Sequence, residues 1–143
     1  MTERDDLSTI NDEDPLWRRI VNVPQWIKEL PDGSYRVSSA AFKDGRTGEV
    51  SVHLAKLTTQ GKALAQHPEK GLVEIVVNLP RSLGHSVVYD PTDDDPSHCL
   101  ICPPQNQTEK TRNRDARKMA EAVRWLVYPL AIRSSSDLSI DSI

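Results

Sequence analysis

The segment VVYDPTDDDPSHCLIC, at residues 87–102, constrains the fold of this chain more than any other. Two short apolar runs, at residues 87–89 and 98–101, flank an acidic turn at residues 90–96. Apolar runs of this length that are bounded by Pro and Asp are typical of β-strands. The segment therefore predicts two strands joined by a polar turn, and it also holds both cysteines of the chain.

Other segments add strands and helices in mixed order. Alternating apolar residues predict strands at residues 35–42 and at residues 50–54, which we expect to pair as a hairpin. The run LVEIVV, at residues 72–77, is apolar on both faces and predicts a central strand. Apolar residues spaced three and four apart predict a long helix at residues 109–128.

Short helical segments are expected at several further places. Asp14 and Pro15 are a favourable N-cap and first residue, and they predict the start of a helix that carries Trp17. The other short helical segments are expected at residues 26–30, 58–67 and 80–83.

Together these elements predict an α+β fold in a single small domain. We expect a mixed or antiparallel sheet of about four or five strands, with the long C-terminal helix packed on one face. The length of 143 residues suits one domain, which we place at residues 14–129. Residues 1–13 are predicted to be a disordered acidic arm, and residues 130–143 a disordered Ser-rich tail.

The composition excludes several classes of protein. The formal net charge of −3 gives no overall basic surface for nucleic acid or membrane lipids. No apolar run is long enough to span a bilayer, and residues 1–15 lack the apolar centre of a signal peptide. Two cysteines do not make a disulfide framework. We therefore expect a soluble cytoplasmic protein with reduced thiols, no cofactor and no membrane partner.

Cys99 and Cys102 form a Cys-x-x-Cys pattern that, with His98, resembles part of a zinc site. The Leu-Ile between them favours an extended strand, on which residues three apart point to opposite faces. The acidic turn at residues 90–95 offers oxygen ligands for a divalent cation, but it lacks the glycine and glutamate of an EF-hand loop. We therefore predict buried strand cysteines, a solvated turn and no metal site.

His98 is the candidate for a catalytic role. A histidine at the start of a strand can act as a general acid or base, with Arg36 and Ser38 nearby if their strands pair. The carboxylates of residues 90–95 would assist it. This interpretation gives one alternative function, a small hydrolase or nuclease that uses His98, Arg36 and Ser38.

Two further groups of residues are candidates for binding. The basic run at residues 110–124 suits phosphate contacts and gives a second alternative function, a nucleic-acid-binding module. The plain interpretation of Trp17 and Trp125 is core packing between two terminal helices, whereas an exposed tryptophan would mark a binding surface. The candidate binding residues are Trp17, Trp26, Arg112, Arg114, Arg117 and Lys118.

Several motifs resemble those of a group of small bacterial proteins of unassigned function. An RVSSxAF strand and an LGxxVVYDPxxxDPSH segment carry the resemblance, which extends over residues 16–125. It implies a bacterial or phage-related source and a role as a small component of a multi-gene defence or toxin system, and it adds weight to His98, Arg36 and Ser38. The matching positions are Arg36, Ser38, Phe42, Ser51, Val52, Leu83, Gly84, Asp90, Pro91, Pro96 and His98.

The sequence holds neither a phosphate-binding glycine loop nor a nucleophile elbow. Its hydrophobic content of 37% predicts a modest core, and both ends are polar. These features favour a non-enzymatic small subunit or adaptor that binds a protein partner. The hydrolase or nuclease and the nucleic-acid-binding module remain the two alternatives.

Overall fold

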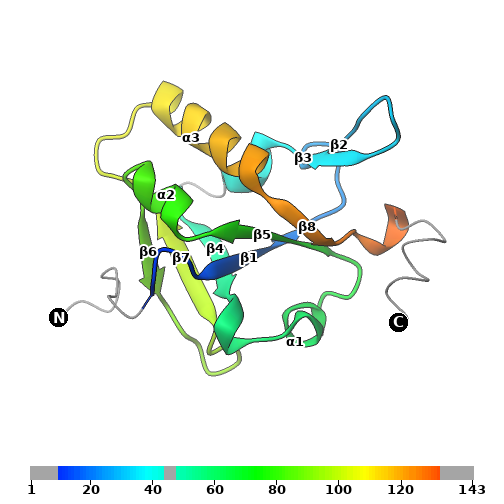
Figure 1. The fold of residues 1–143 in the computed structure, drawn as a ribbon, viewed down its shortest axis with the longest axis horizontal. Helices are drawn as coiled ribbons and strands as arrows, with labels where there is room; N and C mark the ends of the chain where they lie inside the picture. The colour runs from blue at the N-terminus through cyan, green and yellow to red at the C-terminus, as the bar shows by residue number, and fades with distance from the viewer. Residues whose placement is uncertain (1–9, 44–47, 133–143) are drawn as a thin grey trace.

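The computed structural model describes residues 10–43 and 48–132, and the predictions for residues 1–9 and 133–143 lie outside this part of the chain. The strands are β1 (Pro15–Ile20), β2 (Ile27–Glu29), β3 (Tyr35–Val37), β4 (Val50–Leu54), β5 (Gly71–Val76), β6 (Ser86–Tyr89), β7 (His98–Cys102) and β8 (Arg124–Val127). Six of them form an antiparallel sheet in the order β6-β7-β4-β1-β5-β8 (Figure 1). β2 and β3 form a separate two-stranded sheet.

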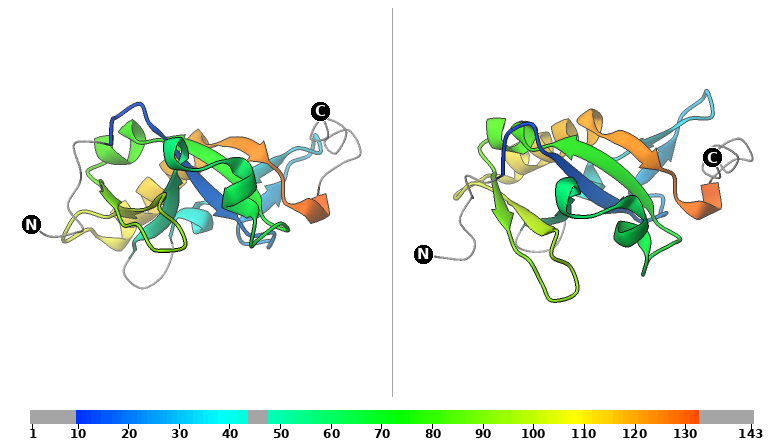
Figure 2. Two further views of the ribbon diagram at one scale, coloured as in Figure 1. Left: turned by 90° about the horizontal axis from the view of Figure 1, so that it is seen from below. Right: turned by 60° about the horizontal axis from the view of Figure 1, so that its bottom comes forward.

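The helices of the described chain are α1 (Gln60–Leu64), α2 (Asn78–Ser82), α3 (Glu109–Ala122) and the 3-10 helices η1 (Ser39–Phe42), η2 (Ala55–Leu57) and η3 (Leu130–Ile132). α3 lies over one face of the large sheet, whereas α1 lies on the opposite side (Figure 1, Figure 2). None of these helices has the length and apolarity needed to cross a membrane. The predicted α+β fold is confirmed, as is the long helix on one face, but the large sheet has six strands.

The hairpin predicted from residues 87–102 is confirmed. β6 and β7 pair antiparallel, with Val87 opposite Ile101. β5 is the buried strand expected from the LVEIVV run, and it pairs with β1 on one side and β8 on the other. α1 begins at a predicted cap, where the Thr59 hydroxyl accepts a hydrogen bond from the backbone N–H three residues later.

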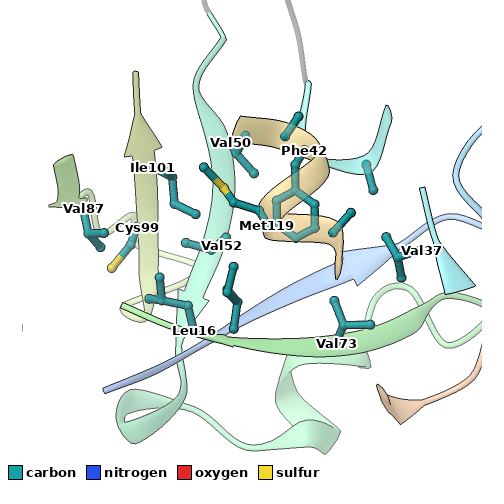
Figure 3. Close-up of a cluster of buried hydrophobic side chains, with 14 of the residues drawn as sticks. Leu16, Val37, Phe42, Val50, Val52, Val73, Val87, Cys99, Ile101 and Met119 are labelled. Atoms are coloured by element: carbon teal, nitrogen blue, oxygen red, sulfur yellow. The ribbon is translucent and has the colours of Figure 1, made fainter. Parts of the chain in front are cut away.

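The main core lies between the large sheet and α3. Met119 of α3 and Phe42 of η1 pack with Val50 and Val52 of β4 (Figure 3). Each fully buried side chain of this kind contributes roughly 1.5–3 kcal/mol to folding. Because side chains alternate along each strand, the opposite face of the sheet carries a separate set of residues.

The N-terminal segment forms β1, and the helix predicted from Asp14 and Pro15 is wrong. Side chains along the segment alternate between half-buried and buried, with Leu16 and Ile20 in the core. This period of two fits a strand and not a helix. Hydrogen bonds to both β4 and β5 outweigh a weak local preference for a helix start, so Trp17 lies on a strand.

Residues 26–30 and 35–42 also differ from the prediction. The first segment holds β2 instead of a helical turn, and the second divides into β3 and η1. β3 pairs with β2, and β4 pairs with β1 and β7, so the predicted hairpin between residues 35–42 and 50–54 is wrong. Gly33, with a φ of 87°, supplies the turn that lets β2 and β3 pair with each other instead.

α3 ends at Ala122, so the helix predicted at residues 109–128 is too long. Val123 already has an extended backbone, and the residues after it form β8 at the edge of the sheet next to β5. Aromatic and β-branched residues in this segment favour a strand. Trp125 therefore lies on β8, where its indole N–H donates to the Tyr35 carbonyl, and it does not pack against an N-terminal helix.

The ordered structure begins before residue 14. Ile10 is only 2% exposed and belongs to the core. Asp12 forms an ion pair with Arg81 at 2.8 Å, and Asp14 forms one with Lys56 at 2.8 Å. The described part of the predicted acidic arm is therefore attached to the domain.

The end of β8 and the chain that follows it pass close to Gly71, the first residue of β5. A substitution at Gly71 tests this close contact. A Cβ at this position would lie 2.6 Å from Pro129 Cδ and 2.9 Å from the Val127 carbonyl oxygen. We expect Gly71→Ala to lower the free energy of unfolding by about 1–3 kcal/mol, because the backbone must move to accept the methyl group. The measurement is urea-induced unfolding.

Gly61→Ala in α1 is the matched control. Its methyl group would meet only the Thr59 hydroxyl, at 3.9 Å, and the higher helix propensity of Ala should raise the stability by up to about 1 kcal/mol. A Gly71→Ala protein as stable as the wild type would contradict the close contact between β5 and Pro129.

Candidate functional site

The polar face, which is the face of the large sheet opposite α3, holds a row of side chains from five neighbouring strands. The strand register places these residues directly across from one another. Because side chains alternate along a strand, this row points away from the core. The core is lined by the neighbouring residues of the same strands. In strand order, the row consists of His98, His53, Trp17, Glu74 and Arg124.

His53 is held by the turn between β6 and β7. Its Nδ1 lies 2.8 Å from Asp95 Oδ2 and 3.4 Å from the Ser97 hydroxyl. Asp95 Oδ1 accepts hydrogen bonds from the Ser97 hydroxyl at 2.6 Å and from the Ser97 backbone N–H at 3.1 Å. Burial raises the pKa of Asp95, but these hydrogen bonds and the nearby His53 outweigh it, and the net shift is downward. Because an ionised carboxylate only accepts, the neutral His53 ring is protonated on Nδ1.

His98 is held by the same turn and reaches a serine with its second nitrogen. Its Nδ1 lies 2.9 Å from the Asp90 backbone carbonyl and 3.2 Å from the Asp90 carboxylate. Both groups accept, so Nδ1 donates and Nε2 accepts from the Ser51 hydroxyl at 3.2 Å. Ser51, His98 and Asp90 thus stand in the order of a nucleophile, a base and the group that orients the base.

The two histidines are neighbours on the polar face. Their ring centroids are 6.1 Å apart, and the ring planes meet at 70°. The His53 side chain is 5% exposed, whereas the His98 side chain is 18% exposed. His98 is therefore the more accessible of the two histidines.

The pKa of His53 is lowered from 6.5 to about 4, and burial is the largest cause. The charges of Arg19 and His98 contribute to this decrease, while Asp95 opposes it. His53 is therefore neutral near pH 7. A neutral ring at this position adds no positive charge beside His98.

Trp17, in the middle of the row, is fixed by its neighbours. Its indole N–H donates to one oxygen of Glu74 at 3.0 Å, and Arg124 donates to the other at 2.9 Å. Burial raises the pKa of Glu74, but these two hydrogen bonds outweigh it and the net shift is downward. Trp26 lies on the core side of β1, with the Arg18 guanidinium 5.0 Å from its ring centroid. Both tryptophans are half-buried, and their binding role stays a prediction.

A cleft of about 430 Å³ opens between α1 and the turn that joins β6 to β7. Arg19 reaches it from β1, and its Nε donates to the Ala63 carbonyl at 2.6 Å. The Arg19 charge is near enough to lower the pKa of His53, so the cleft adjoins the histidine pair. The charged and titratable residues that line the cleft are Arg19, Lys62, His67, Asp94 and Asp95.

Arg36 and Ser38, the partners predicted for His98, lie elsewhere. Arg36 is exposed on β3 of the small sheet, opposite Lys28. The Ser38 hydroxyl donates to the Gln25 backbone carbonyl. Within the described chain, neither residue has a recorded hydrogen bond or ring contact with His98.

Sequence reasoning missed Ser51 as a neighbour of His98, and it considered His53 beside His98 only as a ligand of the rejected zinc site. The alternating pattern of Val50–Leu54 already puts the serine and the histidine on one face of a strand. The missing information was the pairing of β4 with β7, which places His53 directly opposite His98. Arg19 was missed for a related reason, because its segment was taken for a helix.

The basic residues of α3 are divided between two environments. Arg114 donates to Asp115 at 3.1 and 3.2 Å, and Arg112 is half-buried. Arg117 and Lys118 are exposed. Part of the basic run is therefore used within the fold, and nucleic-acid binding by α3 stays a prediction.

The two cysteines lie on opposite faces of β7, as a strand requires. Cys99 is buried in the core, and burial raises the pKa of its thiol to about 12. Cys102 is half-buried, with Sγ 3.8 Å from Glu49 Oε2. Among the described residues, no group of three His, Cys, Asp or Glu side chains is placed to hold a metal ion.

Comparisons of the chain with protein-family models, curated proteins and solved structures gave no match. The resemblance to small bacterial proteins therefore stays a prediction.

The lowered pKa of His53 predicts that the folded protein loses stability in mild acid. The unfolded chain protonates this histidine near pH 6.5, whereas the folded chain keeps it neutral down to about pH 4. Between these values the unfolded state binds more protons, so the free energy of unfolding falls as the pH falls, by about 3 kcal/mol in total. Urea unfolding at several pH values across this range measures the slope.

His53→Gln should flatten this part of the profile, because its amide can still donate to Asp95 but does not titrate. His67→Gln, at a half-exposed position, is the control and should change the slope much less. Equal slopes for the wild type and His53→Gln would contradict a neutral buried ring.

Proposed function

We propose that the protein is a small serine hydrolase that acts on esters, with Ser51 as the nucleophile, His98 as the general base and Asp90 as the orienting group. The proposal is carried by one series of hydrogen bonds on the polar face. Ser51 Oγ is 3.2 Å from His98 Nε2, and His98 Nδ1 is 2.9 Å from the Asp90 backbone carbonyl oxygen and 3.2 Å from the Asp90 carboxylate. Nucleophile, base and orienting group within hydrogen-bond reach are the signature of covalent catalysis. The proposal keeps His98 and one of the carboxylates of residues 90–95 from the predicted hydrolase, and it replaces Arg36 and Ser38 with Ser51.

The arrangement supports a two-step acyl transfer. The Ser51 oxygen attacks the ester carbonyl carbon while its proton moves to His98 Nε2, and Asp90 stabilises the imidazolium through Nδ1–H. The imidazolium gives this proton to the leaving alcohol oxygen as the carbon–oxygen bond breaks, and the acyl group stays on Ser51. Water then attacks the acyl carbon, His98 takes the water proton and returns it to the Ser51 oxygen, and the free acid is released.

Two further observations support this assignment. Ser51 is exposed, so a substrate can approach its hydroxyl. The neutral His53 does not repel the transient positive charge on His98.

Ester hydrolysis tests the proposal. The wild type should hydrolyse p-nitrophenyl butyrate faster than buffer alone, and Ser51→Ala and His98→Gln should each lower kcat/KM by about two orders of magnitude or more. Ser82→Ala, which changes an exposed serine on α2, is the matched control and should keep the wild-type rate. Thermal unfolding of each variant separates lost catalysis from a lost fold.

A fluorophosphonate probe gives a second readout. We expect Ser51 Oγ to displace fluoride from the phosphorus atom of the probe. Mass spectrometry of the labelled peptides should locate the adduct on Ser51. Equal rates for the wild type and a folded Ser51→Ala, or labelling confined to another serine, would overturn the proposal.

The docking function favoured by the sequence is our second proposal, for a protein partner within a multi-gene defence or toxin system. The observation that favours it is the outer edge of β8, which ends the large sheet and pairs with no other described strand. An extended segment of a partner can add to such an edge through backbone hydrogen bonds.

Native purification from the host cell tests this second proposal. A stoichiometric partner that is lost on Leu126→Pro would support it, because this residue lies at the irregularity of β8 and Pro removes a backbone donor there. A chain recovered from its host only at its own mass of 16.0 kDa would count against it.

A further inference from the structure

We infer that the cleft between α1 and the β6–β7 turn binds the anionic group of the hydrolase's substrate, a carboxylate or a phosphate, through the Arg19 guanidinium. The reaction named here rests on the proposed function. The anion site itself rests on separate observations and is tested separately.

Arg19 presents an oriented pair of donors to the cleft. Among the described residues its one hydrogen bond runs from Nε to the Ala63 carbonyl, at 2.6 Å. This bond fixes the plane of the guanidinium and leaves its two terminal NH₂ groups as donors. A planar guanidinium binds a carboxylate or phosphate with two parallel hydrogen bonds.

Burial makes this guanidinium selective for an anion. Arg19 is half-buried, so its charge is only partly hydrated. Asp95, which lines the cleft together with Arg19, directs one oxygen to Ser97 and the other to His53. An incoming anion therefore supplies hydrogen bonds that the protein does not make to Arg19.

The charges on the two walls place the anion on the α1 side of the cleft. Lys62 adds a second cation there, and the half-exposed His67, whose pKa is lowered by burial and by the charges of Lys70 and Arg19, adds a neutral ring. Asp94 and Asp95 line the opposite wall and repel an anion. Aliphatic carbons of Leu57 and neighbouring residues complete the lining and suit the alkyl part of a small ester.

The cleft lies next to the proposed catalytic residues. Asp95 lines the cleft and also holds His53, whose ring centroid is 6.1 Å from that of His98. Arg19 and Ser51 lie on the adjacent strands β1 and β4. A small ester with a charged end can place that end on Arg19 and its carbonyl group near Ser51.

Two esters of similar length separate anion binding from the chemical step: mono-p-nitrophenyl succinate, which carries a carboxylate, and p-nitrophenyl butyrate, which does not. We expect the wild type to have the lower KM for the succinate ester. Arg19→Gln should raise that KM about tenfold or more, with little change in kcat, and should change the KM of the butyrate ester much less. Arg19→Lys keeps the charge without the planar pair of donors and should recover only part of the affinity.

Lys110→Gln, at an exposed position on α3, is the matched control and should alter neither ester. Equal KM values for the two esters, unchanged by Arg19→Gln, would overturn the anion site. Ester hydrolysis in the same experiment would leave the serine hydrolase standing.

A binding measurement without turnover tests the anion site independently of the proposed hydrolase. Titration of succinate, and separately of inorganic phosphate, should shift the backbone amide resonances of Ala63 and His67 in the wild type and in Ser51→Ala, but not in Arg19→Gln. The ligand with the lower Kd identifies the preferred anion. Shifts without ester hydrolysis would support the anion site and overturn the hydrolase, whereas no shift with either ligand would overturn the anion site.

Discussion

The alternation of side chains along β1 is the constraint on which the rest of the structure depends. β1 lies inside the large sheet, paired with β4 on one side and β5 on the other. Leu16 and Ile20 enter the core, while Trp17 and Arg19 belong to the polar face. A slip of one residue in either pairing would exchange the two sets and bury Arg19 against α3. One strand register therefore specifies both the core and the surface that carries the candidate site.

Arg18 connects the core side of β1 with the candidate nucleophile. It is 5% exposed, and it donates from Nε to the Ala41 carbonyl at 3.0 Å and from Nη1 to the Ser51 carbonyl at 2.8 Å. Regular pairing of β1 with β4 covers only Leu16 and Trp17, so the Arg18 side chain supplies a hydrogen bond to β4 beyond the paired residues. The backbone of Ser51 is thus held from the core side, while its hydroxyl reaches His98 on the other face.

Local patterns predicted the elements whose partners are close in sequence. The β6–β7 hairpin needs only two apolar runs and the turn between them, and α1 needs only a cap at Thr59. The same patterns failed at β1 and β8, because a strand gains its stability from neighbours that local sequence does not identify. Ser51 and His53 can be placed on one face of a strand from their spacing alone. Their approach to His98 depends on the pairing of β4 with β7. These two strands are separated along the chain by η2, α1, β5, α2 and β6.

The acidic turn between β6 and β7 has a larger role than the solvated connection that its composition predicts. Asp90 holds Nδ1 of His98, and Asp95 holds Nδ1 of His53. Asp95 uses Oδ1 to close the turn onto Ser97 and Oδ2 to hold the ring, so the bonds that stiffen the turn do not compete with the bond that orients the histidine. In both rings the second nitrogen is then fixed as the acceptor. The orientation of both rings therefore follows from a local turn, whereas the pairing of β4 with β7 brings Ser51 and His53 to His98.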